Sequence, residues 1–291
     1  MGYRLRKILK FTGWSLGGVF ALLAAFLALL AWPGFLFAHQ LEYRSFTVHS
    51  DEDLQGRIEP ILAAIGRQLS TSEIADPRLQ YDFYFGHDNE AFRLMDRARW
   101  AILTPLTDIS PSPVFATGWP PHLNQVVCLD VPDPTNDALL REGWRSRLNM
   151  VHLLTHESGH LLVANRLGMQ GAMQLPLWKA EGYPEYIAAQ VIRTSPGYSL
   201  RSSVTRLLTA NLAGFRDAQG NFLPLHYGQL GRSFLRDENG DHWHTTYYLA
   251  RVMVEYSLDV RGMSFAQLAD ERVREDVVLR DLLADYAAGR F

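Results

Sequence analysis

The hydrophobic pattern divides the chain into an apolar N-terminal run and a longer region of short alternating elements. Residues 11–38 carry no charged side chain, and about 20 helical residues suffice to cross a bilayer. The basic residues before this run favour a cytoplasmic N-terminus: Arg4, Arg6, Lys7 and Lys10. We therefore predict a cytoplasmic tail at 1–10, a single-pass transmembrane signal anchor at 11–38 and an extracytoplasmic domain at 39–291, which would be periplasmic in a bacterium. A cleavable signal peptide is the alternative, although no small-x-small triplet follows the apolar core.

Beyond this run, the spacing of apolar residues switches between the periods of strands and helices. Period-two alternation predicts strands at 44–50, 81–85 and 124–131. Helical spacing predicts helices at 54–69, 90–100, 139–167, near 181–193, and at 200–212, 245–258 and 276–288. Gly168 stands where a glycine commonly ends a helix. The pattern predicts an α+β fold, with a small strand and helix region followed by a mainly helical region.

Composition and charge narrow the class of protein. The chain has 291 residues, 47% hydrophobic and 20% charged, which is typical of a globular protein. A net charge of -3, without interleaved basic and aromatic residues, argues against a broad nucleic-acid surface. Cys128 is the only cysteine, so the chain can form neither an internal disulfide nor a cysteine-based zinc site. The apolar neighbours of Cys128 predict that it is buried.

The candidate chemistry lies in the segment His156-Glu157-Ser158-Gly159-His160. Residues four apart share one face of a helix, so the two histidines can bind one metal ion while Glu157 takes a proton from water. A catalytic zinc ion needs a third protein ligand from another element. Glu181, at the start of the next helical segment, supplies a carboxylate. Glu185, one helical turn later, is the competing candidate for the third ligand, but it is better suited to hydrogen-bond a ligand than to bind the metal ion itself.

His152 lies four residues before His156 and needs a separate interpretation. At 1.5 Å of rise per residue, His152 and His160 lie about 12 Å apart along a helix, too far to share one metal ion. We interpret His152 as a polar residue with a hydrogen-bonding partner, placed to support a ligand.

The order of these motifs resembles the gluzincin zinc metallopeptidases, especially the aminopeptidase-like branch and its small bacterial relatives. The matching residues are His-Glu-x-x-His, then Trp178, Glu181 and Gly182 in the pattern Trp-x-x-Glu-Gly, and then Tyr186. The resemblance is specific over about residues 145 to 190. It implies a zincin-like catalytic region with one zinc ion, which is held by His156, His160 and Glu181, and Glu157 as the general base toward zinc-activated water. Pro184 departs from the pattern, since relatives commonly have Ala at this position.

The resemblance also implies an oxyanion donor and a substrate strand. The segment 247–256 is similar to a later family helix whose Tyr donates to the oxyanion, and Tyr247 fits that register better than Tyr248. His242 or His244, following Asp241, is a further candidate for this role. An extended substrate would lie along the strand at 124–131.

The function implied is that of a membrane-anchored zinc metallopeptidase acting on a peptide or protein substrate. Two alternatives use the same residues. One is a zinc-binding module that kept the fold without proteolysis, and the other is a hydrolase of a cell-wall or lipid-linked amide near the membrane. No motif for holding a free amino terminus accompanies the site, so exopeptidase activity is not implied.

Overall fold

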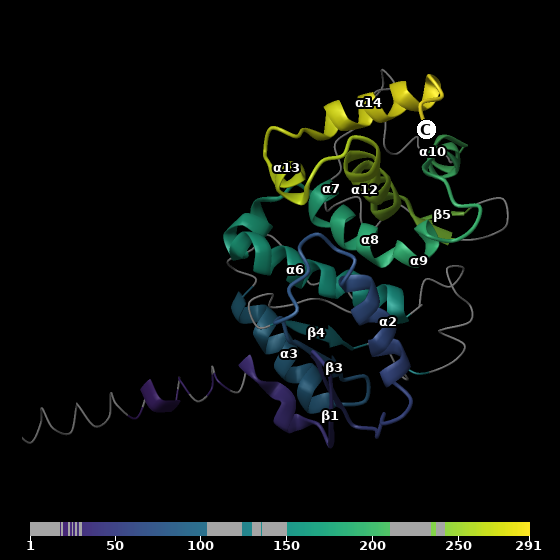
Figure 1. Cartoon of the computed structure of the whole chain (residues 1–291). Helices are drawn as coiled ribbons and strands as arrows, with labels where there is room; N and C mark the ends of the chain where they lie inside the picture. The colour runs from purple at the N-terminus through teal and green to yellow at the C-terminus, as the bar shows by residue number, and fades with distance from the viewer. Residues whose placement is uncertain are drawn as a thin grey trace, which may run out of the picture.

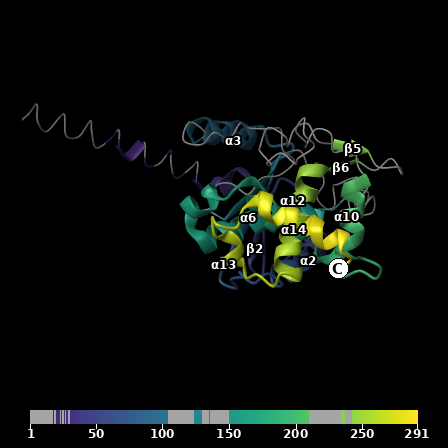
Figure 2. The ribbon, with the colours of Figure 1, turned by 90° about the horizontal axis from the view of Figure 1, so that it is seen from above.

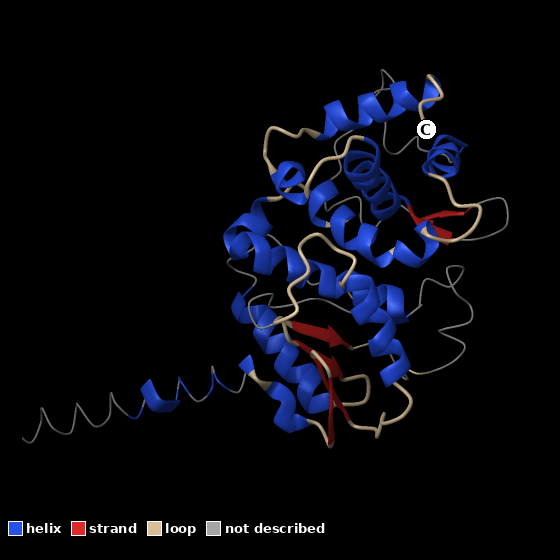
Figure 3. Ribbon diagram, viewed as in Figure 1, coloured by secondary structure: helices blue, strands red, loops and turns tan. Residues whose placement is uncertain are grey.

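A computed structural model describes residues 31–103, 124–129, 135, 150–209, 234–236 and 242–291, together with scattered positions between 18 and 28. A small sheet lies at one end of the domain, helix α6 (Met150–Gln174) crosses the middle, and the C-terminal helices lie at the other end (Figures 1 and 3). The predicted mixed class is confirmed, with strands in the N-terminal part and mainly helices after residue 150.

Four strands form the sheet, in the order β1 (His39–Tyr43), β2 (Phe46–Ser50), β3 (Tyr81–Phe85) and β4 (Gln125–Cys128). β1 and β2 form an antiparallel hairpin, while β3 and β4 run parallel to β2. The prediction of one strand at 44–50 was wrong at its start, because the chain turns at Arg44 with a φ of 56°. β1 escaped prediction because it is a largely exposed edge strand that carries three polar residues. The strand at 81–85 is confirmed, and that at 124–131 is shorter within the described residues.

The alternation of side chains places an apolar layer on each face of the sheet. Phe83 and Val126 belong to the main core, which also includes α2 (Glu59–Leu69) and α6. Tyr84 and Val127 face the other way and pack with Phe92 of α3 (Glu90–Leu103). Cys128 is fully buried, as predicted. Helix α2 starts later than the predicted residue 54, since the chain before Glu59 forms turns.

Helix α6 connects the sheet to the helical part. It packs on α2 and β4 and also on α8 (Gly182–Ala188). Gly168, with a φ of 73° and a ψ of 163°, interrupts the helix and confirms the predicted end at 167. The residues from 139 to 149, where we predicted the start of this helix, lie outside the described residues.

The helix predicted near 181–193 is divided into two short helices, α8 and α9 (Gln190–Arg193), and a further short helix that was not predicted, α7 (Leu177–Ala180), precedes them. α8 lies between α6 and α12 (Thr245–Glu255), and α12 continues as a π-helical turn, Tyr256–Val260. Viewed from above, α12 and α14 (Glu275–Ala287) cross over α6 (Figure 2).

The remaining elements complete the C-terminal part. α10 (Leu200–Thr209) and α14 pack against α12 and confirm two further predicted helices. The short helix α13 (Phe265–Ala269) and the hairpin of β5 (Phe234–Arg236) with β6 (His242–His244) were not predicted. Elements of three to five residues are too short to show a period.

The predicted tail at 1–10 and about half of the predicted anchor at 11–38, including all of 11–17, lie outside the described residues. No helix that the described residues form is long and apolar enough to cross a bilayer. At the end of the anchor range, the 3₁₀ turn η1 (Pro33–Leu36) packs on the domain. Its Pro33 is buried, and the ring of Phe37 lies 4.8 Å from that of Phe92.

Candidate metal centre

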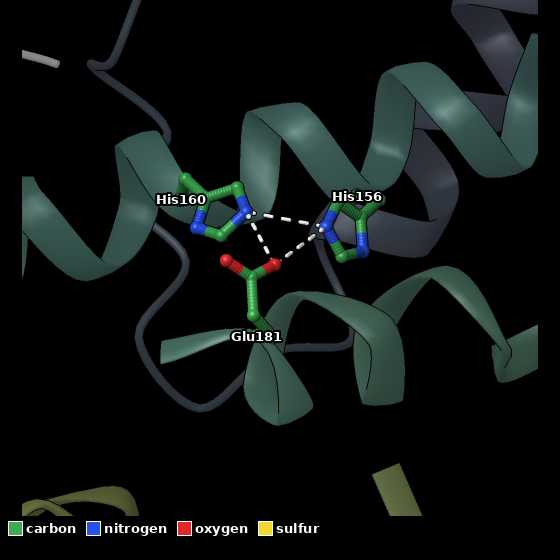
Figure 4. A group of neighbouring side chains, drawn as sticks. All are labelled: His156, His160 and Glu181. Carbon is green, nitrogen blue, oxygen red and sulfur yellow. Dashed lines mark hydrogen bonds and ion pairs between the residues drawn. The ribbon is translucent and has the colours of Figure 1, made fainter. Parts of the chain in front are cut away.

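Three of the predicted site residues meet where α6 faces the α7–α8 junction. His156 and His160 project from successive turns of α6, and Glu181 rises toward them from the junction (Figure 4). The two Nε2 atoms lie 3.2 Å apart, and Glu181 Oε2 lies 3.3 Å from His156 Nε2 and 3.4 Å from His160 Nε2. In the described part of the chain, this is the one group of three or more His, Cys, Asp or Glu residues arranged to hold a metal ion.

The spacing of these atoms suits zinc. Zinc binds imidazole nitrogen and carboxylate oxygen at about 2.0–2.2 Å, so two ligands of a tetrahedral ion lie about 3.3–3.6 Å apart. The three distances observed, 3.2, 3.3 and 3.4 Å, lie at the short end of this range or within 0.1 Å of it. Glu181 Oε2 is also buried and accepts no hydrogen bond of normal geometry, which an ion at this point would remedy. Three protein ligands leave a fourth position for water or substrate.

Glu185 fixes the orientation of the His156 ring. His156 Nδ1 lies 3.0 Å from Glu185 Oε2, on the side of the ring away from Glu181. Donation of the Nδ1 proton to this carboxylate leaves the lone pair of Nε2 directed at the predicted metal position. Glu181 therefore lies beside Nε2 of His156, whereas Glu185 lies beside Nδ1. This geometry favours Glu181 as the ligand.

The carboxylates and imidazoles shift one another's pKa. Burial by itself would lower the pKa of His156, but Glu181 and Glu185 beside it raise that pKa well above its usual value. Burial would raise the pKa of both carboxyls, yet the neighbouring imidazoles hold each of them below its usual value. The site thus favours anionic carboxylates beside positive charge, and a divalent cation would supply this charge in place of protons.

Two glycines allow the helices of the site to approach closely. A Cβ on Gly159 would lie 2.8 Å from Pro184 Cα of α8, and a Cβ on Gly182 would lie 2.6 Å from the carbonyl oxygen of Ala250 on α12. Real Cβ atoms essentially never come within 3.0 Å of another atom, so neither position accepts a side chain unless a helix moves. Pro184 is accommodated because it lies in the first turn of α8 and packs directly on Gly159.

Glu157, the predicted general base, follows His156 on α6 and is only 8% exposed. Its negative charge contributes to the raised pKa of His156. Burial, and then the charge of Glu157, raise the pKa of the Cys128 thiol well above its usual value. The thiol therefore stays neutral, and the structure places Glu157 next to the three predicted ligands rather than among them.

The two candidate tyrosines of α12 have different surroundings. The ring of Tyr247 lies 5.4 Å from that of His156, at an interplanar angle of 88°. Tyr248 is 7% exposed, and the guanidinium of Arg251 lies 4.7 Å from its ring centre. Of the two tyrosines, Tyr247 is thus the one that lies beside the candidate metal ligands. Of the alternatives, Asp241 lies outside the described residues, and only the backbone of His242 and His244 is described, as β6.

A buried ion pair on the same helix was not predicted. Arg251 Nη1 donates to Glu255 Oε2 at 2.9 Å and to the hydroxyl of Tyr198 at 2.9 Å. The Tyr198 hydroxyl itself contacts both oxygens of Glu255. The signal in the sequence was the i,i+4 spacing of opposite charges within an otherwise apolar helix. This network fixes the helix that carries Tyr247.

The strand predicted to bind substrate, β4, forms an edge of the described sheet and runs parallel to β3. No protein-family model matches the chain, and no curated protein or solved structure matches it at a significant level. The likeness to the gluzincins therefore rests on the residues and their geometry.

Proposed function

We propose that the chain is a zinc-dependent metallopeptidase. The observation that carries this proposal is the triangle of His156 Nε2, His160 Nε2 and Glu181 Oε2, whose edges of 3.2 to 3.4 Å match a tetrahedral zinc ion. Glu157 would supply a base and Tyr247 a hydroxyl donor beside this triangle. That combination is the one needed to hydrolyse a peptide bond with water.

The roles of the residues follow from their positions. His156, His160 and Glu181 would hold a zinc ion, which would supply a Lewis acid for the water and for the substrate carbonyl. Glu157 takes the proton from the attacking water and returns it to the leaving amine. Tyr247 donates a hydrogen bond to the oxyanion of the tetrahedral intermediate. Glu185 keeps the proton of His156 on Nδ1.

We extend the proposal to the way in which a substrate binds and to the cellular location of the domain. An extended peptide along β4 would present its carbonyl to the three proposed zinc ligands. We also propose that the predicted anchor at 11–38, up to the turn η1 that packs on the domain, holds the domain at the membrane with the catalytic part outside the cytoplasm. Among the described residues of this range before η1, four large apolar side chains are exposed, namely Phe20 at 68%, Leu22 at 73%, Phe26 at 45% and Trp32 at 61%. A lipid environment would cover them.

The test compares the full chain in detergent micelles with its Glu157→Gln variant. Both are loaded with zinc, checked for metal content, and incubated with a diverse peptide mixture whose products are read by mass spectrometry. We expect cleavage by the wild type and a loss of about 10²- to 10⁴-fold in the variant, with zinc still bound. Glu42→Gln, which changes an exposed glutamate of β1, is the matched control and should retain activity.

Two outcomes would contradict the proposal. Equal cleavage by the Glu157→Gln variant would rule out Glu157 as the base. A zinc-loaded wild type that cleaves no peptide would rule out a general peptidase, and turnover of a cell-wall or lipid-linked amide would then identify the substrate class.

A further inference from the structure

A second imidazole holds the carboxylate that orients His156. His152 Nε2 lies 3.0 Å from Glu185 Oε1 and 3.1 Å from Oε2. Glu185 Oε2 in turn lies 3.0 Å from His156 Nδ1. His152 and His156 are one turn apart on α6, so the two rings meet the same carboxylate from successive turns.

His152 is not itself placed to bind the ion. It stands outside the group of ligand atoms that lie within 4.8 Å of one another. Two turns of helix separate it from His160, which is about 12 Å of rise. Any influence of His152 on the metal therefore has to pass through Glu185.

Glu185 needs such a partner because it is buried. Its side chain is 8% exposed, and each of its oxygens contacts a histidine. Without His152, Oε1 would lose the partner that the structure gives it, and a buried carboxylate oxygen without a partner is unfavourable. The carboxylate would then rotate or admit water, and Oε2 would no longer be fixed opposite Nδ1 of His156.

We propose that His152 is a positioning residue for the zinc site, acting through Glu185 to hold His156 in the tautomer and orientation that bind the ion. The pair extends the site by one turn of α6 beyond the His-Glu-x-x-His motif. This inference rests on the proposed zinc site, but it does not depend on the reaction that the site catalyses.

The experiment measures the zinc dissociation constant of the full chain by competition with a chromophoric chelator. Removal of a partner that orients a ligand typically weakens metal binding 10- to 100-fold. We expect Glu185→Gln to fall within that range and His152→Leu to weaken binding by about tenfold, near its lower end. His152→Gln, which keeps an N–H near the position of Nε2, should retain most of the affinity.

A double-variant cycle shows whether His152 acts through Glu185. Residues that act through one contact give changes that do not add. The double variant His152→Leu/Glu185→Gln should therefore bind zinc about as weakly as Glu185→Gln alone. His39→Leu, a change to an exposed histidine of β1, is the matched control and should leave the dissociation constant unchanged.

Three results would contradict the proposal, and the first of them can be distinguished from the other two. A wild type that binds no zinc refutes the proposed site together with the role of His152. A wild type that binds zinc, with His152→Leu binding it equally well, refutes the role of His152 alone, as does a double variant in which the two losses multiply. If His152→Leu does not fold, His152→Asn replaces it, because the shorter amide places its N–H near Nδ1 instead of Nε2.

Discussion

The contact between Gly159 and Pro184 sets the distance between α6 and α8, and Gly159→Ala tests it. The added Cβ would lie 2.8 Å from Pro184 Cα, whereas ordinary contact begins at 3.4 Å. The helices would have to separate by about 0.6 Å, which is three times the tolerance of about 0.2 Å for metal–ligand distances. Because α6 carries the two imidazoles and α8 follows Glu181, this movement opens the ligand triangle.

The expected effect on stability is a small net loss. Overpacking costs about 1–3 kcal/mol, and replacement of a helical glycine by alanine offsets about 1 kcal/mol of it. The metal-free variant should therefore be less stable by up to about 2 kcal/mol, a decrease in Tm of up to about 8 °C for a domain of this size. Zinc affinity should fall on the order of tenfold or more, as it does when a ligand loses its orienting partner.

Chelator competition and thermal unfolding without metal measure the two effects separately. Gly66→Ala is the matched control, because a Cβ at Gly66 in α2 would lie 3.5 Å from the ring of Phe46, an ordinary contact. That variant should gain about 0.5–1 kcal/mol and bind zinc normally. The reasoning fails if Gly159→Ala gains stability as Gly66→Ala does and binds zinc as tightly as the wild type.

Three further predictions concern α12 and the sheet. Tyr247→Phe should lower kcat by about 10²-fold with little change in zinc affinity, whereas Tyr248→Phe should leave kcat nearly unchanged; equal losses in a steady-state assay would remove Tyr247 from the oxyanion role. Arg251→Leu should destabilise the fold by about 3–5 kcal/mol in urea unfolding, because the buried Glu255 loses its hydrogen-bonded cation and keeps only Arg193, whose Nε lies 3.8 Å from Glu255 Oε1. The double change Arg251→Leu/Glu255→Leu should recover much of this loss. Burial lowers the pKa of His49 in the folded state, so the unfolded chain binds the proton more tightly. Stability should therefore fall as the pH drops below about 6.5, and a His49→Asn variant with the same pH slope between 5 and 7 would contradict this assignment.

The two histidines of the candidate metal centre could be predicted because their spacing along the chain fixes their spacing in space. His156 and His160 share a helix, and the helix makes their rings converge irrespective of the rest of the fold. Glu181 depends on how α6 packs against the following segment, which periodicity does not reveal. The pattern around Trp178 and Gly182 was needed to choose it over Glu185.

What could not be predicted depends on contacts between distant segments. The contact of Gly159 with Pro184 and that of Gly182 with Ala250 are tertiary contacts that no local period encodes. β1 is an exposed edge strand with a weak apolar signal, so its hairpin with β2 escaped prediction. The sequence predicted that His152 supports a ligand, but its partner, Glu185 on the facing helix, could be identified only in the structure.

The placement of the three proposed ligands on two segments would have a consequence for folding, if the domain is exported as we propose. The single cysteine excludes an internal disulfide, the cross-link that many exported proteins use. A zinc ion that joins α6 to the segment before α8 would tie the chain together at this point instead. By mass action, free zinc at a thousand times its dissociation constant adds about 4 kcal/mol to the free energy of unfolding. Removal of the metal by a chelator would then release a cross-link as well as a catalyst.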